Sequence, residues 1–327
     1  MRLPEELLVA IQPEVEKVDR STLARASAQV TQQYHAADFS FPAVRNEAHR
    51  AAYLAIRLPA IYAANWRVFS EVRRLVPQAE VAGLLDLGSG PGTALFAASE
   101  IFPALRQATL VESDEAWLKL GSRIAGKSLR PVLRQAHWVR QDLRTELHCP
   151  PHDLVVISYA LGELPQSAAA TLLRQAWNCA TKFLVIIEPG TMRGFAVINA
   201  ARSALIADKA QILAPCPHQD ACPMAGAGDW CHFSQRLERT SQHRQLKGGA
   251  LSYEDEKFSY IVASRQNHAP AGSRIVRHPQ KHSGHIQLTL CARHGIETRI
   301  ETRTVTRSQK HDYKLARHAE WGGIWKE

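Results

Sequence analysis

The 327-residue sequence contains no apolar run near the roughly 18 residues that a membrane-spanning helix needs. Its opening stretch, MRLPEELLVAIQPEVEKVDR, lacks the basic start and apolar middle of a signal peptide. It also lacks the Arg-rich, acid-poor character of a mitochondrial presequence. We therefore expect a cytoplasmic protein with no membrane partner.

The six cysteines include no close C-x2–4-C pair of the kind that zinc fingers and ribbons use. Thiols stay reduced in the cytoplasm, so no disulfide framework is expected. Cys149 and Cys179 stand alone and are interpreted as ordinary small buried residues. The four that remain are Cys216, Cys222, Cys231 and Cys291.

The first three of these cysteines follow a C-x5-C-x8-C pattern, and 59 residues separate the third from the fourth. Four thiolates can surround a zinc ion or hold an iron–sulfur cubane, and uneven spacing favours the wider cluster. Spacing alone leaves iron, zinc and reduced structural thiols open. His218 and His232 compete as fourth ligand, but Cys291 supplies a thiolate for that place.

Positive charge is concentrated in the last part of the chain. Residues 1–190 hold 20 Lys and Arg against 19 Asp and Glu, whereas residues 191–327 hold 20 against 12. Such asymmetry indicates that the C-terminal part faces a polyanion, and nucleic acid is the favoured one. The alternative is a solvated basic surface that aids solubility.

The pattern of apolar residues changes twice along the chain, which predicts three regions. Residues 1–78 read as helical, residues 79–205 alternate short apolar strands with helices, and residues 206–327 carry the cysteines and strands rich in basic residues. Strands alternating with helices predict a parallel, doubly wound α/β sheet. The predicted strands cover residues 81–86, 108–112, 136–142, 153–158 and 183–188.

The first predicted strand ends in DLGSGPGT, a glycine loop that leads into a helix. Its G-x-G-x-G spacing, with Pro91 removing one amide donor, suits a ligand without phosphates better than a dinucleotide. The loop resembles motif I of class I S-adenosylmethionine-dependent methyltransferases. This resemblance implies a cofactor site at Asp86, Gly88, Ser89, Gly90 and Gly92.

Two acids end the next strands where that class places cofactor contacts. Glu112 would accept hydrogen bonds from both ribose hydroxyls, and Asp142 would accept a hydrogen bond from the adenine amino group. The alternatives are a Rossmann-like fold with a degenerate pocket and, less favoured, a nicotinamide dehydrogenase.

A narrower resemblance rests on RLPAIYAA, DLGSGPGT, LGELP, IEPGT, CPHQDACP, DWCHFSQR and GHIQLTLCARHG. Together these segments resemble the methyltransferase-like family associated with the small ribosomal subunit in bacteria and mitochondria. The resemblance implies a class I methyltransferase fold, with an N-terminal helical region and a C-terminal cysteine insertion and antiparallel strands. It also implies a [4Fe–4S] cluster on the four cysteines and binding to small-subunit rRNA or its precursor particle.

Catalysis is less supported than cofactor binding. Amino-group methyltransferases often carry D/N-P-P-Y after the fourth strand, where this chain has SYALGELP. No general base or nucleophile can be named. Two hypotheses follow: an rRNA methyltransferase, or a non-catalytic assembly factor that uses cofactor and cluster structurally.

Overall fold

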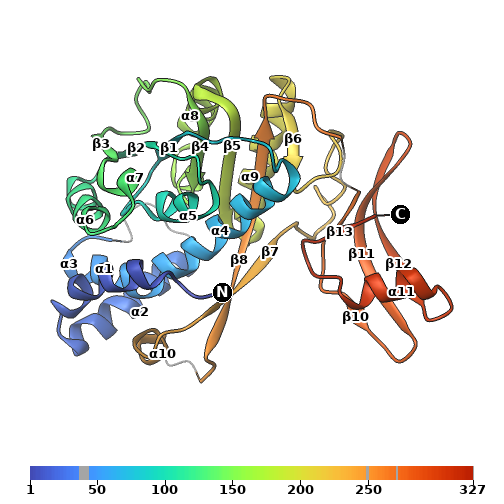
Figure 1. Cartoon of the computed structure of the whole chain (residues 1–327), viewed down its shortest axis with the longest axis horizontal. Helices are drawn as coiled ribbons and strands as arrows, with labels where there is room; N and C mark the ends of the chain where they lie inside the picture. The colour runs from blue at the N-terminus through green and yellow to red at the C-terminus, as the bar shows by residue number, and fades with distance from the viewer. Residues whose placement is uncertain (37–43, 248–249, 270–271, 327) are drawn as a thin grey trace.

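A mixed β-sheet with helices on both faces forms the body of the molecule, and a small β-rich lobe projects from it (Figure 1). This computed structural model describes residues 1–36, 44–247, 250–269 and 272–326. The sheet order is β3-β2-β1-β4-β5-β8-β6, with β7 also paired to β8. The strands are β1 (Gly83–Leu87), β2 (Gln107–Glu112), β3 (His137–Arg140), β4 (His152–Ser158), β5 (Ala180–Pro189), β6 (Gln211–Ala214), β7 (Phe233–Glu238) and β8 (Tyr253–Ser264).

Strands β1 to β5 run parallel, and β8 enters antiparallel between β5 and β6. The strand order reverses between β1 and β4, and the crevice at such a switch point binds ligands in doubly wound sheets. The predicted α/β, Rossmann-like sheet is confirmed. All five residues of β1 are buried, as expected for a parallel strand covered on both faces.

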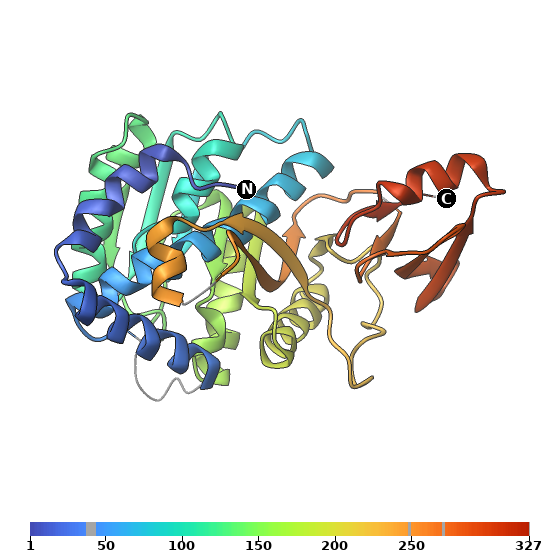
Figure 2. The same ribbon diagram turned by 90° about the horizontal axis from the view of Figure 1, so that it is seen from below.

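The N-terminal helices cover one face of the sheet (Figure 2). They are α1 (Glu5–Glu16), α2 (Arg20–Ala36), α3 (Glu47–Ile56) and α4 (Leu58–Leu75). The expected interruption near Pro59 is a break between α3 and α4, with Pro59 in the first turn of α4, where its missing N–H costs no helical bond. α4 buries a continuous apolar face that includes Tyr62 and Phe69.

The remaining helices complete both layers. α5 (Thr93–Ile101), α6 (Glu115–Gly126) and the short α7 (Pro131–Arg134) share the apolar core of the N-terminal helices. α8 (Gln166–Cys179) and α9 (Met192–Ala207) pack in a second core, which also contains alternate residues of β1, β4 and β5. α10 (Ser241–Lys247) follows β7.

The C-terminal lobe is a separate five-stranded sheet with one helix. Its order is β10-β11-β9-β13, and β12 pairs with β11. The elements are β9 (Ser273–Ile275), β10 (Gln280–Lys281), β11 (His285–His294), β12 (Glu297–Thr306), α11 (Lys310–Arg317) and β13 (Ile324–Trp325). Region 206–327 therefore contributes β6 to β8 to the body and β9 to β13 to the lobe.

The hairpin β11–β12 has two different faces. Leu288, Leu290 and Val305 belong to the apolar core of the lobe together with Ala316 of α11. Cys291 and its register partner Ile300 face the other way and line a cavity between hairpin and body. This alternation places one cysteine of the lobe against the cysteine loop of the body.

Candidate cofactor cleft and cysteine cavity

The glycine loop between β1 and α5 is held by backbone hydrogen bonds to the neighbouring strand. Gly88 N and Ser89 N both donate to Val111 O, at 2.9 and 3.0 Å. Gly88 and Gly92 have φ values of +78° and +83°. A Cβ at Gly88 would lie 2.7 Å from Ala160 Cβ, so both backbone conformation and space demand glycine there.

Glu112, the last residue of β2, ties this loop to the start of α6. Its Oε2 accepts a hydrogen bond from Gly90 N at 2.9 Å, and its Oε1 accepts from Ser113 N at 2.7 Å and Asp114 N at 3.0 Å. The carboxylate is only partly buried and lies on the wall of a cleft. Its side chain therefore fixes the loop while facing the space where a ligand would lie.

The cleft lies at the carboxyl ends of β1, β2 and β4 and encloses about 1580 Å³, its open mouth included. Of the predicted cofactor residues, Gly88, Gly90, Glu112 and Asp142 line it. Arg144 donates to both oxygens of Asp142, and these bonds lower the pKa of that carboxyl. Aromatic side chains that sequence reasoning missed also line the cleft: Tyr53, Trp117 and Tyr159.

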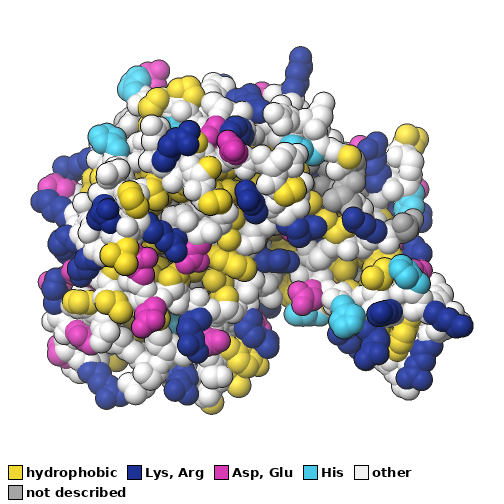
Figure 3. Space-filling view, in the orientation of Figure 1, with side chains coloured by type: hydrophobic (Ala, Val, Ile, Leu, Met, Phe, Trp, Pro, Cys, Tyr) yellow, Lys and Arg dark blue, Asp and Glu magenta, His cyan; other side chains and the backbone are white. Residues whose placement is uncertain are grey.

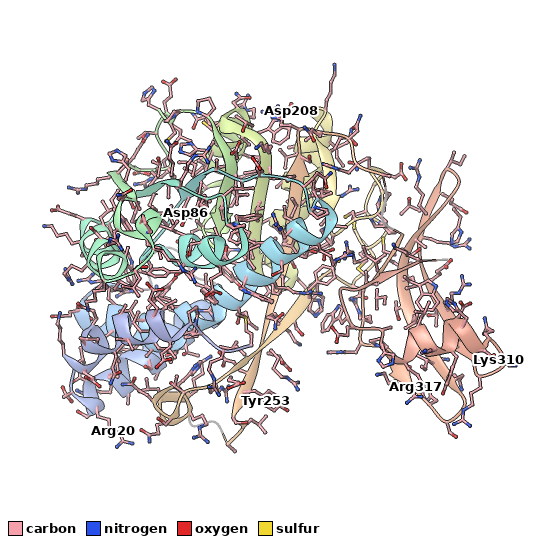
Figure 4. All side chains as sticks on the ribbon, viewed as in Figure 1. Arg20, Asp86, Asp208, Tyr253, Lys310 and Arg317 are labelled. Atoms are coloured by element: carbon pink, nitrogen blue, oxygen red, sulfur yellow. The ribbon has the colours of Figure 1, made fainter. Side chains whose placement is uncertain are left out.

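Asp86, Ser89 and Gly92 are not among the described residues that line this cleft. Asp86 is 1% exposed within the body (Figure 4), and its Oδ2 has no hydrogen-bond partner among the described residues. Burial, followed by the negative charge of Glu112, raises the pKa of Asp86 to about 7. A Cβ on Gly92 would lie 2.9 Å from the Trp138 ring, so Gly92 permits close packing under the loop.

Tyr159 directly follows β4 and has a left-handed backbone, with φ +57°. Such a conformation is costly for a non-glycine residue and is often found at functional sites. Its hydroxyl donates to Glu256 Oε1 at 2.8 Å, and Arg57 lies 3.6 Å from the same carboxylate oxygen. The sequence draws attention to the segment after β4 through LGELP and through the motif that it lacks, but not through Tyr159.

The four clustered cysteines line one cavity between body and lobe, with about 550 Å³ of empty space when its open mouth is included. Cys216 follows β6, Cys222 lies in the next loop, Cys231 precedes β7 and Cys291 belongs to β11. Burial, and then the proximity of other cysteines of the set, raise the pKa of Cys231 and Cys291. One loop that carries three of the cysteines and a distant strand that carries the fourth thus line the same cavity.

Within the described ranges, no group of three or more His, Cys, Asp or Glu side chains that could hold a metal ion is found. All six cysteines are free thiols.

Two buried arginines also line the cysteine cavity, Arg202 of α9 and Arg274 of β9, each 4% exposed. Sequence reasoning missed both, because an arginine that is buried by tertiary packing has no local signature. Glu71 pairs with Arg274, so Arg202 is the arginine whose charge favours a negatively charged occupant of the cavity.

The lobe presents basic side chains around β12 and α11 (Figure 3). Lys310 and Arg317 mark the two ends of α11 (Figure 4), and Lys314 is exposed between them. Arg299 is engaged with Glu297 and Glu301 and so contributes less free charge. Trp325 is 4% exposed in the core of the lobe, which agrees with packing and not with base stacking.

None of the helices in the described ranges is both long and apolar enough to span a bilayer.

Comparison with known proteins identifies relatives along most of the chain. A family model described as "Mitochondrial small ribosomal subunit Rsm22" matches residues 47–326. The chain is 28% identical over 309 residues to "Ribosome assembly protein METTL17, mitochondrial" of Homo sapiens, covering 89% of this chain and 64% of that protein. It is 26% identical over 331 residues to "Rsm22-cox11 tandem protein 2, mitochondrial" of Schizosaccharomyces pombe, covering 84% and 42%. The chain thus spans less than two thirds of the length of these relatives.

These relatives contradict the predicted cytoplasmic location, which was wrong: the family and the named proteins are mitochondrial. The prediction used the absence of a targeting segment from the opening residues. That absence does not decide the compartment of a chain that covers only part of its relatives.

Solved methyltransferase structures are only distantly similar. Magnesium protoporphyrin IX methyltransferase from Synechocystis, with S-adenosylhomocysteine bound, is 13% identical at a TM-score of 0.43, over 72% of this chain and 94% of that chain. The N-methyltransferase NodS from Bradyrhizobium japonicum is 10% identical at 0.40, over 62% and 88%.

Proposed function

The chain belongs to the Rsm22 family, and from this premise we propose that it is an assembly factor of the small ribosomal subunit, of mitochondrial type, that binds S-adenosylmethionine and rRNA. The observation that carries the proposal is the combination, in one chain, of a cleft walled by Glu112 and Asp142 with a lobe rich in exposed cations. The first fits the cofactor, and the second fits a polyanion.

The cleft supports S-adenosylmethionine as ligand. Glu112 is held at the end of β2, where a carboxylate can accept two ribose hydroxyls, and Asp142 can accept an amino group of the base. Carboxylates also favour a sulfonium cation. When bound, the cofactor supplies an activated methyl group; the residues of this chain bind it and orient it.

A non-catalytic role is favoured over methyl transfer by Tyr159. This residue stands where amino-group methyltransferases carry their acceptor motif, and its hydroxyl is engaged by Glu256. Glu163 also lines the cleft, and burial, followed by the charge of Glu112, raises its pKa to about 7, so this carboxylate is the candidate base for methyl transfer. The rRNA methyltransferase remains the second candidate, supported by the acids of the cleft.

We also propose that Cys216, Cys222, Cys231 and Cys291 hold a [4Fe–4S] cluster. The donor set is soft, the four thiols line one cavity, and the buried Arg202 lies in the same lining. We propose a cluster and not a single zinc ion because of the uneven spacing of the four cysteines along the chain. Bound there, it would fasten the lobe to the body by bonds to Cys291 and add to stability.

Calorimetry with S-adenosylmethionine tests the cleft. Glu112→Gln should weaken binding at least about tenfold, because a neutral amide accepts the ribose hydroxyls and the loop amides less well. Glu115 is an exposed carboxylate of the next helix and pairs with Lys119, so Glu115→Gln should not weaken binding. Absence of binding by the wild-type protein would remove the cofactor from the proposal.

Iron analysis after anaerobic purification tests the cysteine cavity. Wild-type protein should be brown and contain about four irons per chain, and Cys291→Ser should lose most of them. Cys179→Ser changes a thiol outside the cavity and should retain iron. Stoichiometric zinc in place of iron would overturn the cluster.

The two candidate functions differ in the rRNA of cells that lack the protein. If it is an assembly factor alone, mass spectrometry should find the same methyl marks with and without it, despite a defect in small-subunit assembly. A mark that returns with wild type but not with Glu112→Gln would establish the methyltransferase.

A further inference from the structure

His218 lies between Cys216 and Cys222 in the sequence, and its ring reaches the fourth cysteine of the cavity. The side chain is 2% exposed, and its Nε2 lies 3.5 Å from Cys291 Sγ. The ring therefore bridges the cysteine loop of the body and strand β11 of the lobe.

Arg202 contacts both the backbone and the ring of His218. Its Nη2 lies 3.0 Å from His218 O and 3.4 Å from His218 Nδ1. A guanidinium only donates hydrogen bonds, so this contact fits the tautomer in which Nδ1 is the acceptor. A neutral imidazole with Nδ1 as acceptor carries its proton on Nε2, which faces the sulfur.

We propose that His218, oriented by Arg202, donates an N–H···S hydrogen bond to Cys291 and thereby raises the reduction potential of the cluster that the four cysteines hold. This inference rests on the proposed cluster. Reduction adds negative charge to the cluster and its sulfurs, and a donor aimed at one sulfur stabilises the reduced state more than the oxidised state.

His232 offers a matched control within the same loop. It is 8% exposed and follows Cys231 directly, but it contacts Trp230 O and the rings of Trp230 and Trp321. Replacing it removes a buried imidazole beside a cysteine without removing the donor to Cys291.

The test is an EPR-monitored redox titration of anaerobically purified, full-length protein. His218→Leu should make reduction about tenfold less favourable, which for one electron lowers the potential by about 59 mV. His218→Gln, which keeps a side-chain N–H donor, should recover part of the shift, and His232→Leu should match the wild type. A potential in His218→Leu equal to the wild-type value overturns the inference.

Arg202 is tested by a double-variant cycle. Arg202→Lys keeps the positive charge but lacks the planar guanidinium that meets both His218 O and Nδ1. It should lower the potential in the wild-type background and change it little in the His218→Leu background. Equal shifts in both backgrounds would show that Arg202 acts independently of His218 and would overturn its orienting role.

The inference can still be tested if the His218→Leu variant loses its cluster. If His218→Leu contains no iron, Arg202→Lys alone decides: an unchanged potential overturns the inference. Absence of iron from the wild type is a different result, because it refutes the proposed cluster itself.

Discussion

Arg274 and Glu71 form a buried ion pair, with Arg274 Nη1 2.7 Å from Glu71 Oε1 and both side chains 4% exposed. Arg274 belongs to β9 of the lobe, and Glu71 belongs to α4 of the body. The same guanidinium donates to Pro215 O and Gly322 O, each at 2.7 Å. One side chain thus joins the body, the cysteine loop and the C-terminal segment.

Removing Arg274 should strongly destabilise the protein. Arg274→Met leaves Glu71 buried with only its second partner, Arg74, and loss of one member of a buried pair costs about 3–5 kcal/mol. Urea unfolding measures this cost. Arg74→Ala, which removes a half-exposed partner of the same carboxylate, should cost about 1 kcal/mol or less. Equal losses in the two variants would contradict the role of Arg274 as the main partner.

A second prediction concerns the packing of Trp138 against α6. A Cβ at Gly121 would lie 2.6 Å from the Trp138 ring, whereas a Cβ at Gly126, in the same helix, would meet nothing within 4 Å. Gly121→Ala should therefore cost about 1–3 kcal/mol of stability by overpacking. Gly126→Ala should be neutral or stabilising by up to about 1 kcal/mol, because alanine is the better helix former. Thermal unfolding of both variants tests this prediction. A Gly121→Ala variant as stable as the wild type would show that the Trp138 ring can move aside.

The sequence predicted β1, β4 and β5 well because a strand buried on both faces reads as a continuous apolar run. It did not predict β7, whose segment FSQRLE is mostly polar, or the first residues of β8, with which β7 pairs. The position of β8 between β5 and β6 depends on pairing between distant segments and has no local signal.

In the candidate sites, too, features with a local sequence signal were predicted and features set by tertiary structure were missed. Cysteines and glycines are rare enough for their spacing to carry information, and the four cysteines do line one cavity. Arg202, Arg274 and Tyr159 were missed because their importance comes from burial and backbone conformation, which only tertiary structure sets. Asp86 was taken for a cofactor contact, but the structure buries it away from the cleft wall.

Asp86 predicts a specific pH dependence of stability. Burial, followed by Glu112, raises its pKa from 3.8 to about 7 in the folded state. Below about pH 4, Asp86 is protonated in both the folded and the unfolded state, and its contribution to stability is fully present. As the pH rises to 7, the unfolded chain loses the Asp86 proton at a lower pH than the folded chain does, and this contribution is lost. The free energy of unfolding of Asp86→Asn minus that of the wild type should therefore increase by about 3 kcal/mol between pH 5 and pH 8.

Asp142→Asn is the control for this measurement. Hydrogen bonds from Arg144 lower the pKa of Asp142, so its contribution is present above about pH 4 and lost only on further acidification. Its difference from the wild type should stay constant between pH 5 and 8. A pH-independent difference for Asp86→Asn as well would contradict the raised pKa of Asp86.

The last prediction separates RNA binding by the lobe from a basic surface that only aids solubility. Lys310 and Lys314 are exposed on α11, so Lys310→Gln with Lys314→Gln removes two charges without disturbing the core of the lobe. If both contact phosphates of single-stranded rRNA, the slope of log affinity against log salt should fall by about 1.4. Arg20→Gln with Arg25→Gln removes two exposed charges from α2, in the body, and should leave that slope unchanged. Filter binding across a salt series measures both variants, and equal slopes for the two would place the RNA contact outside α11.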